Sequence, residues 1–278
     1  TSLGNTFDAD LNNMWTIYGT AKTEPNLTGN PLSSYTNKTP FRTGQAIIGS
    51  TEWLEWCGLK FNWTDYDEAR NACFNYLKNT RTGPDGWSDS DGYVWATANG
   101  QYHLDMGAHY TYNQIFILAA RNYLLQQNNV GEYDENGNVT EFMDVKNGVG
   151  QTMRERLTKA MNYMLNTLDG STGVLVIKDP RNQALGAGGS VASNYWDAMT
   201  SFGYISSYEN ILFYGSLLAY ADILAYYGED NSQYLALAEK VKEKFNDTFW
   251  DRTKKRYITS INANGVKIDF GVTYVNFM

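Results

Sequence analysis

The sequence predicts an all-α fold built as an (α/α) toroid, with antiparallel helical hairpins in two concentric layers and small β-hairpins in the loops. Residues 107–128 and 206–227 are apolar on nearly every face, which is typical of helices buried on all sides. Residues 64–80, 151–168 and 231–249 carry one apolar stripe each. Because the two kinds alternate along the chain, inner helices shielded by outer helices accommodate them better than a simple bundle does.

We expect residues 1–278 to form a single domain, because no linker-like change in composition divides the chain. Residues 1–40 are polar and rich in turn-forming residues, which indicates an extended arm on the surface. Residues 81–101 are predicted to form a loop. Turn signals at 135–138 and 262–265 each predict a β-hairpin.

The net charge of −8 argues against nucleic acid and anionic membranes as partners, since both require basic surfaces. It argues more weakly against a polyanionic sugar. No apolar run reaches the roughly 18 residues of a membrane-spanning helix. The two histidines, His103 and His109, lack neighbouring carboxylates, so we expect no catalytic zinc. No glycine-rich phosphate loop is present, and we expect no cofactor.

The most informative stretch precedes the second all-apolar helix and reads Asn194-Tyr195-Trp196-Asp197. The flanking aromatic rings would partly desolvate Asp197 and favour its protonated form, as a general acid requires. An aspartate near a helix start can instead cap backbone N–H groups. Glu209, at the start of that helix, is either a second site carboxylate or a partner of the helix dipole, and we favour the dipole.

Aromatic and polar residues also precede the first all-apolar helix. His109, beside Tyr110 and ahead of Asn113, can hydrogen-bond sugar hydroxyls, although a structural role is equally open. Trp95, Trp196 and Tyr208 offer flat apolar rings that suit the faces of sugars, and for the tryptophans core packing is nearly as good an interpretation.

These residues resemble the six-hairpin glycosidase superfamily, the (α/α)6 enzymes that include glucoamylases, trehalases and debranching-type glucosidases. Three stretches carry the resemblance: 91–113, 194–225 and 269–274. The resemblance implies that Asp197 is the general acid of a glycoside hydrolase. It also implies a sugar site lined by Trp95, His109, Tyr110, Asn113, Tyr195, Trp196 and Tyr208.

A complete ring in this superfamily needs about twice as many helices as this sequence predicts. The catalytic base usually comes from the second half of the ring, so we expect it outside this chain, in a longer enzyme or on another chain. The expected activity is inverting hydrolysis of a neutral oligo- or polysaccharide, at an extracellular or cell-surface location, with the cytoplasm as the alternative location.

Two other functions stay open on the sequence. A toroidal polysaccharide lyase would use His109 and Tyr110 as base and acid, with Asn194 neutralising a uronate. A non-catalytic carbohydrate-binding or surface protein would need neither acid nor base.

Overall fold

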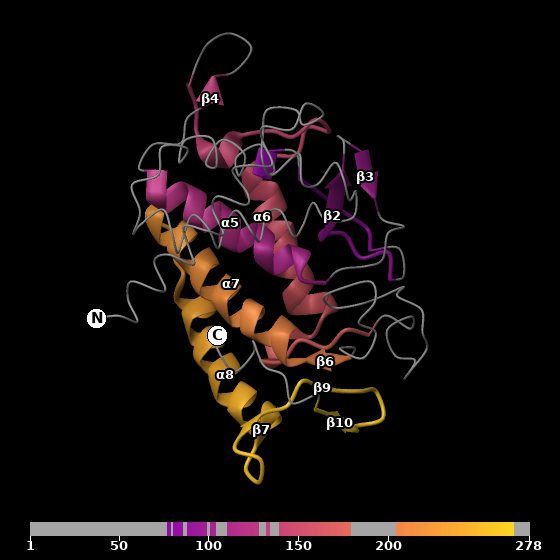
Figure 1. Ribbon diagram of the computed structural model, residues 1–278. Helices are drawn as coiled ribbons and strands as arrows, with labels where there is room; N and C mark the ends of the chain where they lie inside the picture. Colours follow the sequence, from indigo (N-terminus) through magenta and orange to yellow (C-terminus); the bar gives the residue numbers. More distant parts are fainter. Residues whose placement is uncertain are drawn as a thin grey trace, which may run out of the picture.

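The computed structural model describes residues 77–78, 80–85, 88–98, 101–103, 110–127, 132–133, 139–178 and 204–269. This part of the chain is rich in helix and also contains small antiparallel sheets (Figure 1). The predicted arm, residues 1–40, and nearly all of the predicted helix 64–80 lie outside the described residues. Within the described part, no helix is long and apolar enough to cross a membrane.

The helices α5 (Tyr112–Gln127) and α7 (Ser207–Tyr226) are buried over most of their surfaces. The helices α6 (Met153–Asn162) and α8 (Ser232–Phe249) bury one face each and expose the other. This confirms the predicted contrast in exposure for these four helices. A π-helical turn, η4 (Tyr163–Thr167), extends α6 nearly to its predicted end.

The inner helices α5 and α7 lie side by side and run in the same direction (Figure 1). Gln114 and Glu209, near the two helix starts, share a hydrogen bond, and Arg121 and Asp222, further along both helices, form an ion pair. The two helices are therefore parallel. A short turn after Tyr226 reverses the chain into α8, which therefore returns antiparallel along α7. The described helices thus form two layers, whereas closure into a toroid stays a prediction.

The prediction of a loop over residues 81–101 was wrong in part. Strands β1 (Arg81–Gly83), β2 (Tyr93–Ala98) and β3 (Gln101–His103) form a three-stranded antiparallel sheet. Turn-forming residues between β1 and β2 dominate the local sequence pattern, although aromatic and β-branched residues in β2 favour a strand. The fold is therefore helix-rich with small sheets and not all-α.

Gly92 allows this sheet to lie against α6. Its φ angle is +111°, and a Cβ at this position would lie 2.4 Å from the carbonyl oxygen of Lys159. Any larger residue would need the backbone of α6 to move, because a carbonyl oxygen of a helix cannot yield as a flexible side chain can.

The strands on either side of both predicted turns pair antiparallel, while residues 135–138 themselves lie outside the described residues. Strands β4 (Glu132–Tyr133) and β5 (Val139–Thr140) pair across the first, and β9 (Ser260–Ile261) and β10 (Lys267–Ile268) pair across the second. The second hairpin is shorter than predicted, because its first residues form β8 (Arg256–Tyr257), which pairs with β7 (Trp250–Asp251). Strand β6 (Ile205–Ser206) pairs with β9 and sets the start of α7. Short 3-10 turns, η3 (Phe142–Asp144) and η5 (Gly170–Thr172), flank α6 and η4.

Arg156 of α6 is fully buried and joins several parts of the chain. Its guanidinium donates hydrogen bonds to five backbone carbonyl groups, and its Cζ atom lies 6.0 Å from the centroid of the Phe116 ring in α5. The donor–acceptor distances span 2.6–3.1 Å, and the acceptors belong to Leu77, Lys78, Thr80, Val145 and Thr152. A planar group with five N–H donors suits this arrangement, and a lysine ammonium could not reproduce it.

We expect Arg156→Ala to lower the free energy of unfolding by more than about 3 kcal/mol, because several buried carbonyl groups would lose their donor. Arg156→Lys should recover only a small part of this loss. Urea denaturation followed by circular dichroism measures both changes.

Arg154→Ala is the matched control on the same helix. Arg154 is exposed and pairs with Glu229 at 2.5 Å, so its loss should change stability by less than about 1 kcal/mol. Equal losses for the two arginines would show that the buried guanidinium is not a central link.

Candidate functional site

Buried polar residues are concentrated at the end of the domain where α5 and α7 begin. Each of the following is at most 5% exposed: Thr111, Asn113, Gln114, Ser206, Ser207, Glu209, Asn210, Thr259, Ser260 and Asn262. Polar groups in a protein interior require hydrogen-bond partners. Most of this set binds backbone groups, and the exceptions mark the candidate site.

Asn113 joins three elements at the start of α5. Its amide nitrogen donates to the carbonyl oxygens of Gly92 (2.9 Å) and Ala160 (3.0 Å), and its amide oxygen accepts from the backbone N–H of Val94 (2.9 Å). Both amide hydrogens are used and the side chain is 1% exposed. These contacts argue against the predicted contact of Asn113 with a sugar and indicate a structural role instead.

Asn210 joins neighbouring backbone segments in the same way at the start of α7. Its amide oxygen accepts from the backbone N–H of Leu175 at 2.7 Å, and its amide nitrogen donates to the carbonyl oxygens of Leu175 (3.3 Å) and Ser206 (2.8 Å). The hydroxyl of Ser207 donates to the carbonyl oxygen of Thr259 at 2.8 Å. Both inner helices are therefore fixed at their first turns to the segments beside them.

The predicted site tyrosines lie in the interior. Tyr110 is 1% exposed and packs edge-on against Tyr93, with ring centroids 5.8 Å apart. Tyr93 packs in the same way against Tyr163, whose hydroxyl donates to the carboxylate of Asp85 at 3.0 Å. Tyr208 is 5% exposed at the start of α7. The ring contacts of Tyr110 shown here are those of core packing.

Other predicted site residues are described less fully. Trp95 lies in β2 opposite Arg81, and only its backbone is described. His109, Tyr195, Trp196 and Asp197 lie outside the described residues, so their convergence on one site stays a prediction.

Glu209 and Gln114 differ from the asparagines above, because their side chains bond to each other across α5 and α7. Both side chains are 0% exposed, and the amide nitrogen of Gln114 donates to Oε2 of Glu209 at 2.9 Å. In the part of the chain that the structure describes, the other side-chain oxygen of each residue, Oε1, is buried without a hydrogen-bond partner. Burial raises the pKa of Glu209 well above its ordinary value, and the Gln114 hydrogen bond offsets part of that rise.

Two helices share a capping motif but use it differently. In α6, Thr152 and Glu155 form a complete capping box, in which the Glu155 carboxylate accepts from the backbone N–H of Thr152 at 2.8 Å. In α7, the Ser206 hydroxyl accepts from the backbone N–H of Glu209, but the Glu209 carboxylate bonds to Gln114 of α5. Glu155 is exposed, and hydrogen bonding lowers its pKa. Glu209 is therefore more than a cap, and our preference for a helix-dipole role missed its link to α5.

Gln114 was not identified from the sequence at all. The available signal was a polar residue in the first turn of a helix that is otherwise apolar on every face. The same signal applies to Glu209 in α7. Polar residues in such helices have no solvent-exposed face to occupy, so each one requires a partner.

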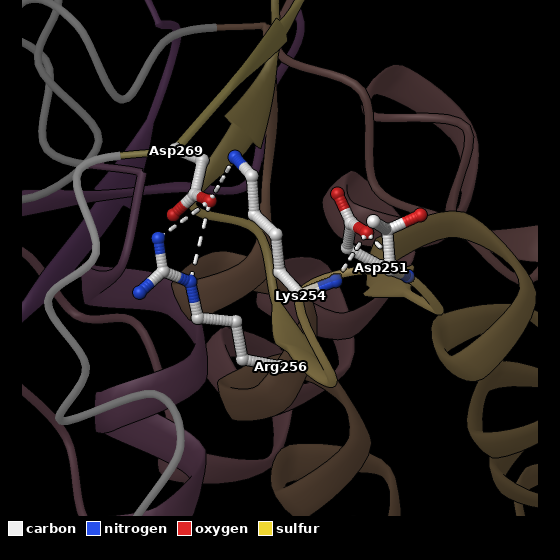
Figure 2. Close-up of polar contacts among 5 residues, drawn as sticks. Asp251, Lys254, Arg256 and Asp269 are labelled. Carbon is white, nitrogen blue, oxygen red and sulfur yellow. Dashed lines mark hydrogen bonds and ion pairs between the residues drawn. The ribbon is translucent and has the colours of Figure 1, made fainter.

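The third stretch of the resemblance begins at Asp269, whose carboxylate forms ion pairs with two cationic side chains (Figure 2). Its carboxylate, 5% exposed, accepts from Lys254 Nζ at 2.7 Å and from Arg256 Nη2 at 3.0 Å. Asp251 accepts from the backbone N–H of Lys254 in the same turn. These contacts anchor the chain at Asp269 to the β7–β8 hairpin. Among the described residues, no group of three or more histidine, cysteine or acidic side chains is arranged to hold a metal ion.

The pKa values predict opposite pH dependences for two glutamates. A carboxyl group whose pKa rises on folding contributes stability below its unfolded pKa and loses it as the pH rises through the folded pKa. We therefore expect Glu209→Gln to become more stable relative to the parent as the pH rises above about 4.3, the ordinary glutamate value.

Glu155→Gln is the control with the opposite sign. The pKa of Glu155 is lowered on folding, so its contribution to stability is lost as the pH falls through the folded pKa. The variant should therefore become less stable relative to the parent as the pH rises toward about 4.3, with no further change above it. Urea midpoints between acidic and mildly alkaline pH measure both trends. Parallel trends in the two variants would contradict the burial of a protonated Glu209.

Comparison with known proteins gives a weak structural likeness. No protein-family model matches the chain, and no curated protein matches it. Among solved structures, the chain is similar to the GH78 family rhamnosidase of Bacillus sp. GL1, with 15% sequence identity and a TM-score of 0.46. The match covers 82% of this chain and 19% of the rhamnosidase chain. This distant likeness to a glycoside hydrolase is too weak to assign the fold or the function.

Proposed function

We propose that this chain belongs to a glycoside hydrolase that acts on a neutral oligo- or polysaccharide, with Asp197 as the general acid. The observation that carries the proposal is the common direction of α5 and α7. Because both helices begin at the same end (Figure 1), we propose that the aromatic and acidic motifs, which precede them in the sequence, lie together at that end of the domain. Function-bearing loops on a rigid scaffold commonly have this arrangement.

The chemistry of the motif fits this reaction class. Glycoside hydrolysis needs one protonated carboxyl group to donate to the leaving oxygen and one carboxylate to activate water or attack the sugar. Asp197 follows Trp196 in the sequence and precedes the aromatic-rich residues that lead into α7. It is suited to the first role, because partial desolvation by aromatic neighbours favours the protonated form. The second carboxylate is proposed to lie outside this chain, and the mode of hydrolysis is proposed to be inverting.

The lyase alternative is not favoured, because Tyr110, its acid, is 1% exposed and packs in the core.

We expect Asp197→Asn to lower kcat/KM for an unactivated glycoside by about 10²-fold or more, because the leaving oxygen would lose its proton donor. An aryl glycoside with a good leaving group should be affected much less, since its departure hardly needs protonation. The assay compares both substrate types in the protein at its natural length, with and without the substitution.

Asp230→Asn is the control, because Asp230 is an exposed aspartate whose carboxylate accepts from the backbone N–H of Ser232 at the start of α8. It should leave both activities unchanged. Full activity of Asp197→Asn on the unactivated glycoside would show that Asp197 caps a helix and is not the acid. Release of an unsaturated uronate product would identify a lyase instead.

A further inference from the structure

The turn of the β9–β10 hairpin presents an Asn-Gly pair to solvent. Figure 1 shows this hairpin at the edge of the described structure, and residues 263–267 are exposed. The backbone N–H of Gly265 donates to the carbonyl oxygen of Asn262 at 2.9 Å, which closes the turn. The side-chain oxygen of Asn262 accepts from the backbone N–H groups of Asn264 (2.9 Å) and Val266 (3.0 Å). Asn262 therefore holds the turn from its buried side, whereas Asn264 is exposed.

The side chain of Asn264 is not fixed by contacts. In the described part of the chain, its amide group forms no hydrogen bond. The next residue, Gly265, has a φ angle of +77°, and a Cβ placed on it would meet no atom within 4 Å. Since glycine has no side chain and its surroundings are open, nothing hinders the approach of the Asn264 side chain to the Gly265 nitrogen.

Among the described residues, an Asn-Gly pair also occurs at Asn147-Gly148, in the opposite environment. Asn147 is 6% exposed. Its amide nitrogen donates to the carbonyl oxygen of Thr80 (3.0 Å) and to Oε1 of Gln151 (2.9 Å). Its amide oxygen accepts from the backbone N–H groups of Val149 (3.1 Å) and Gln151 (2.9 Å). The same dipeptide is thus present once with an unattached side chain and once with a fully bonded one.

We propose that Asn264 is a site of spontaneous deamidation in the folded protein and that the fold protects Asn147 from the same reaction. The Gly265 nitrogen gives its proton to hydroxide and bonds to Cγ of Asn264. The bond from Cγ to the side-chain nitrogen breaks, and ammonia leaves with a proton taken from water. Water then opens the resulting five-membered succinimide ring and leaves either aspartate or isoaspartate at position 264.

The hydrogen bonds of the two asparagines set their relative rates. At the exposed turn, the Gly265 nitrogen must release one hydrogen bond before it can attack, and such local opening costs little. Asn147 must release the four hydrogen bonds of its buried side chain. Because each such bond stabilises the closed state, we expect Asn264 to react about tenfold faster than Asn147, or more.

The modification would occur in a hairpin that is attached to an inner helix. Strand β9 pairs with β6, the strand directly before α7, and the backbone N–H of Ser207 donates to the carbonyl oxygen of Thr259 at 3.0 Å. Isoaspartate adds a methylene group to the main chain, and either product adds a negative charge at position 264. The reaction therefore alters the turn that joins the two strands beside the start of α7.

The experiment follows both sites in the protein at its natural length. The folded protein is incubated at mildly alkaline pH, and a parallel sample is incubated in concentrated urea. Samples are digested at acidic pH, which prevents further reaction, and the peptides are sequenced by tandem mass spectrometry. In the folded sample, Asn264 should be converted while Asn147 stays intact. In urea the two rates should become similar, because both asparagines precede glycine.

Asn264→Gln is the matched control. A glutamine would have to close a six-membered ring, which forms far more slowly, so the hairpin peptide should lose its deamidated product. The rate at Asn147 should stay unchanged. This variant also separates Asn264 from Asn262, which lies in the same peptide and precedes alanine.

Faster conversion of Asn264 in the folded protein, with similar rates in urea, supports the proposal. Equal rates at Asn264 and Asn147 in the folded protein overturn it. It is also overturned if Asn264 stays intact in the folded protein while both sites react in urea. A rate ratio that urea leaves unchanged would show that the fold does not select the site. Persistence of the product in Asn264→Gln would assign it to Asn262, which contradicts the proposal as well.

Discussion

The buried guanidinium of Arg156 is the interaction on which the described fold depends. A charge inside a protein is stable only when hydrogen bonds replace its water, and here five carbonyl groups from separate segments do so. Because those segments lead into β1 and α6, their positions are set together. The three-stranded sheet then lies against α6 through Gly92, and Asn113 connects the same sheet to α5.

The two inner helices are attached by equivalent means. Asn113 in α5 and Asn210 in α7 each bind both an N–H and a carbonyl group of a neighbouring backbone segment. An asparagine amide can replace a peptide group in this way, so the helix starts are held without a continuous sheet. Gln114 and Glu209 add a side-chain link between the first turns of the same two helices.

The candidate site was predictable only in outline. The aromatic and acidic motif that ends at Asp197 is visible in the sequence, but it lies outside the residues that the structure describes. Tyr110 and Asn113 have residue types that suit sugar binding, and their burial could not be predicted because position along the chain does not determine exposure. Gln114 was not identified from the sequence, because its partner, Glu209, is distant along the chain. The link between them exists only once α5 and α7 pack together.

The sequence by itself determined the four described helices, their contrast in exposure and the hairpin turn at 262–265, because periodicity and turn chemistry are local properties. The tertiary structure alone decided what each polar residue does. Thr152-x-x-Glu155 and Ser206-x-x-Glu209 are equivalent as motifs, yet Glu155 is exposed with a lowered pKa and Glu209 is buried with a raised one. The physical reason for this difference is the surroundings of each glutamate. Glu155 begins an outer helix that faces solvent, whereas Glu209 begins an inner helix against α5, where water cannot solvate its charge.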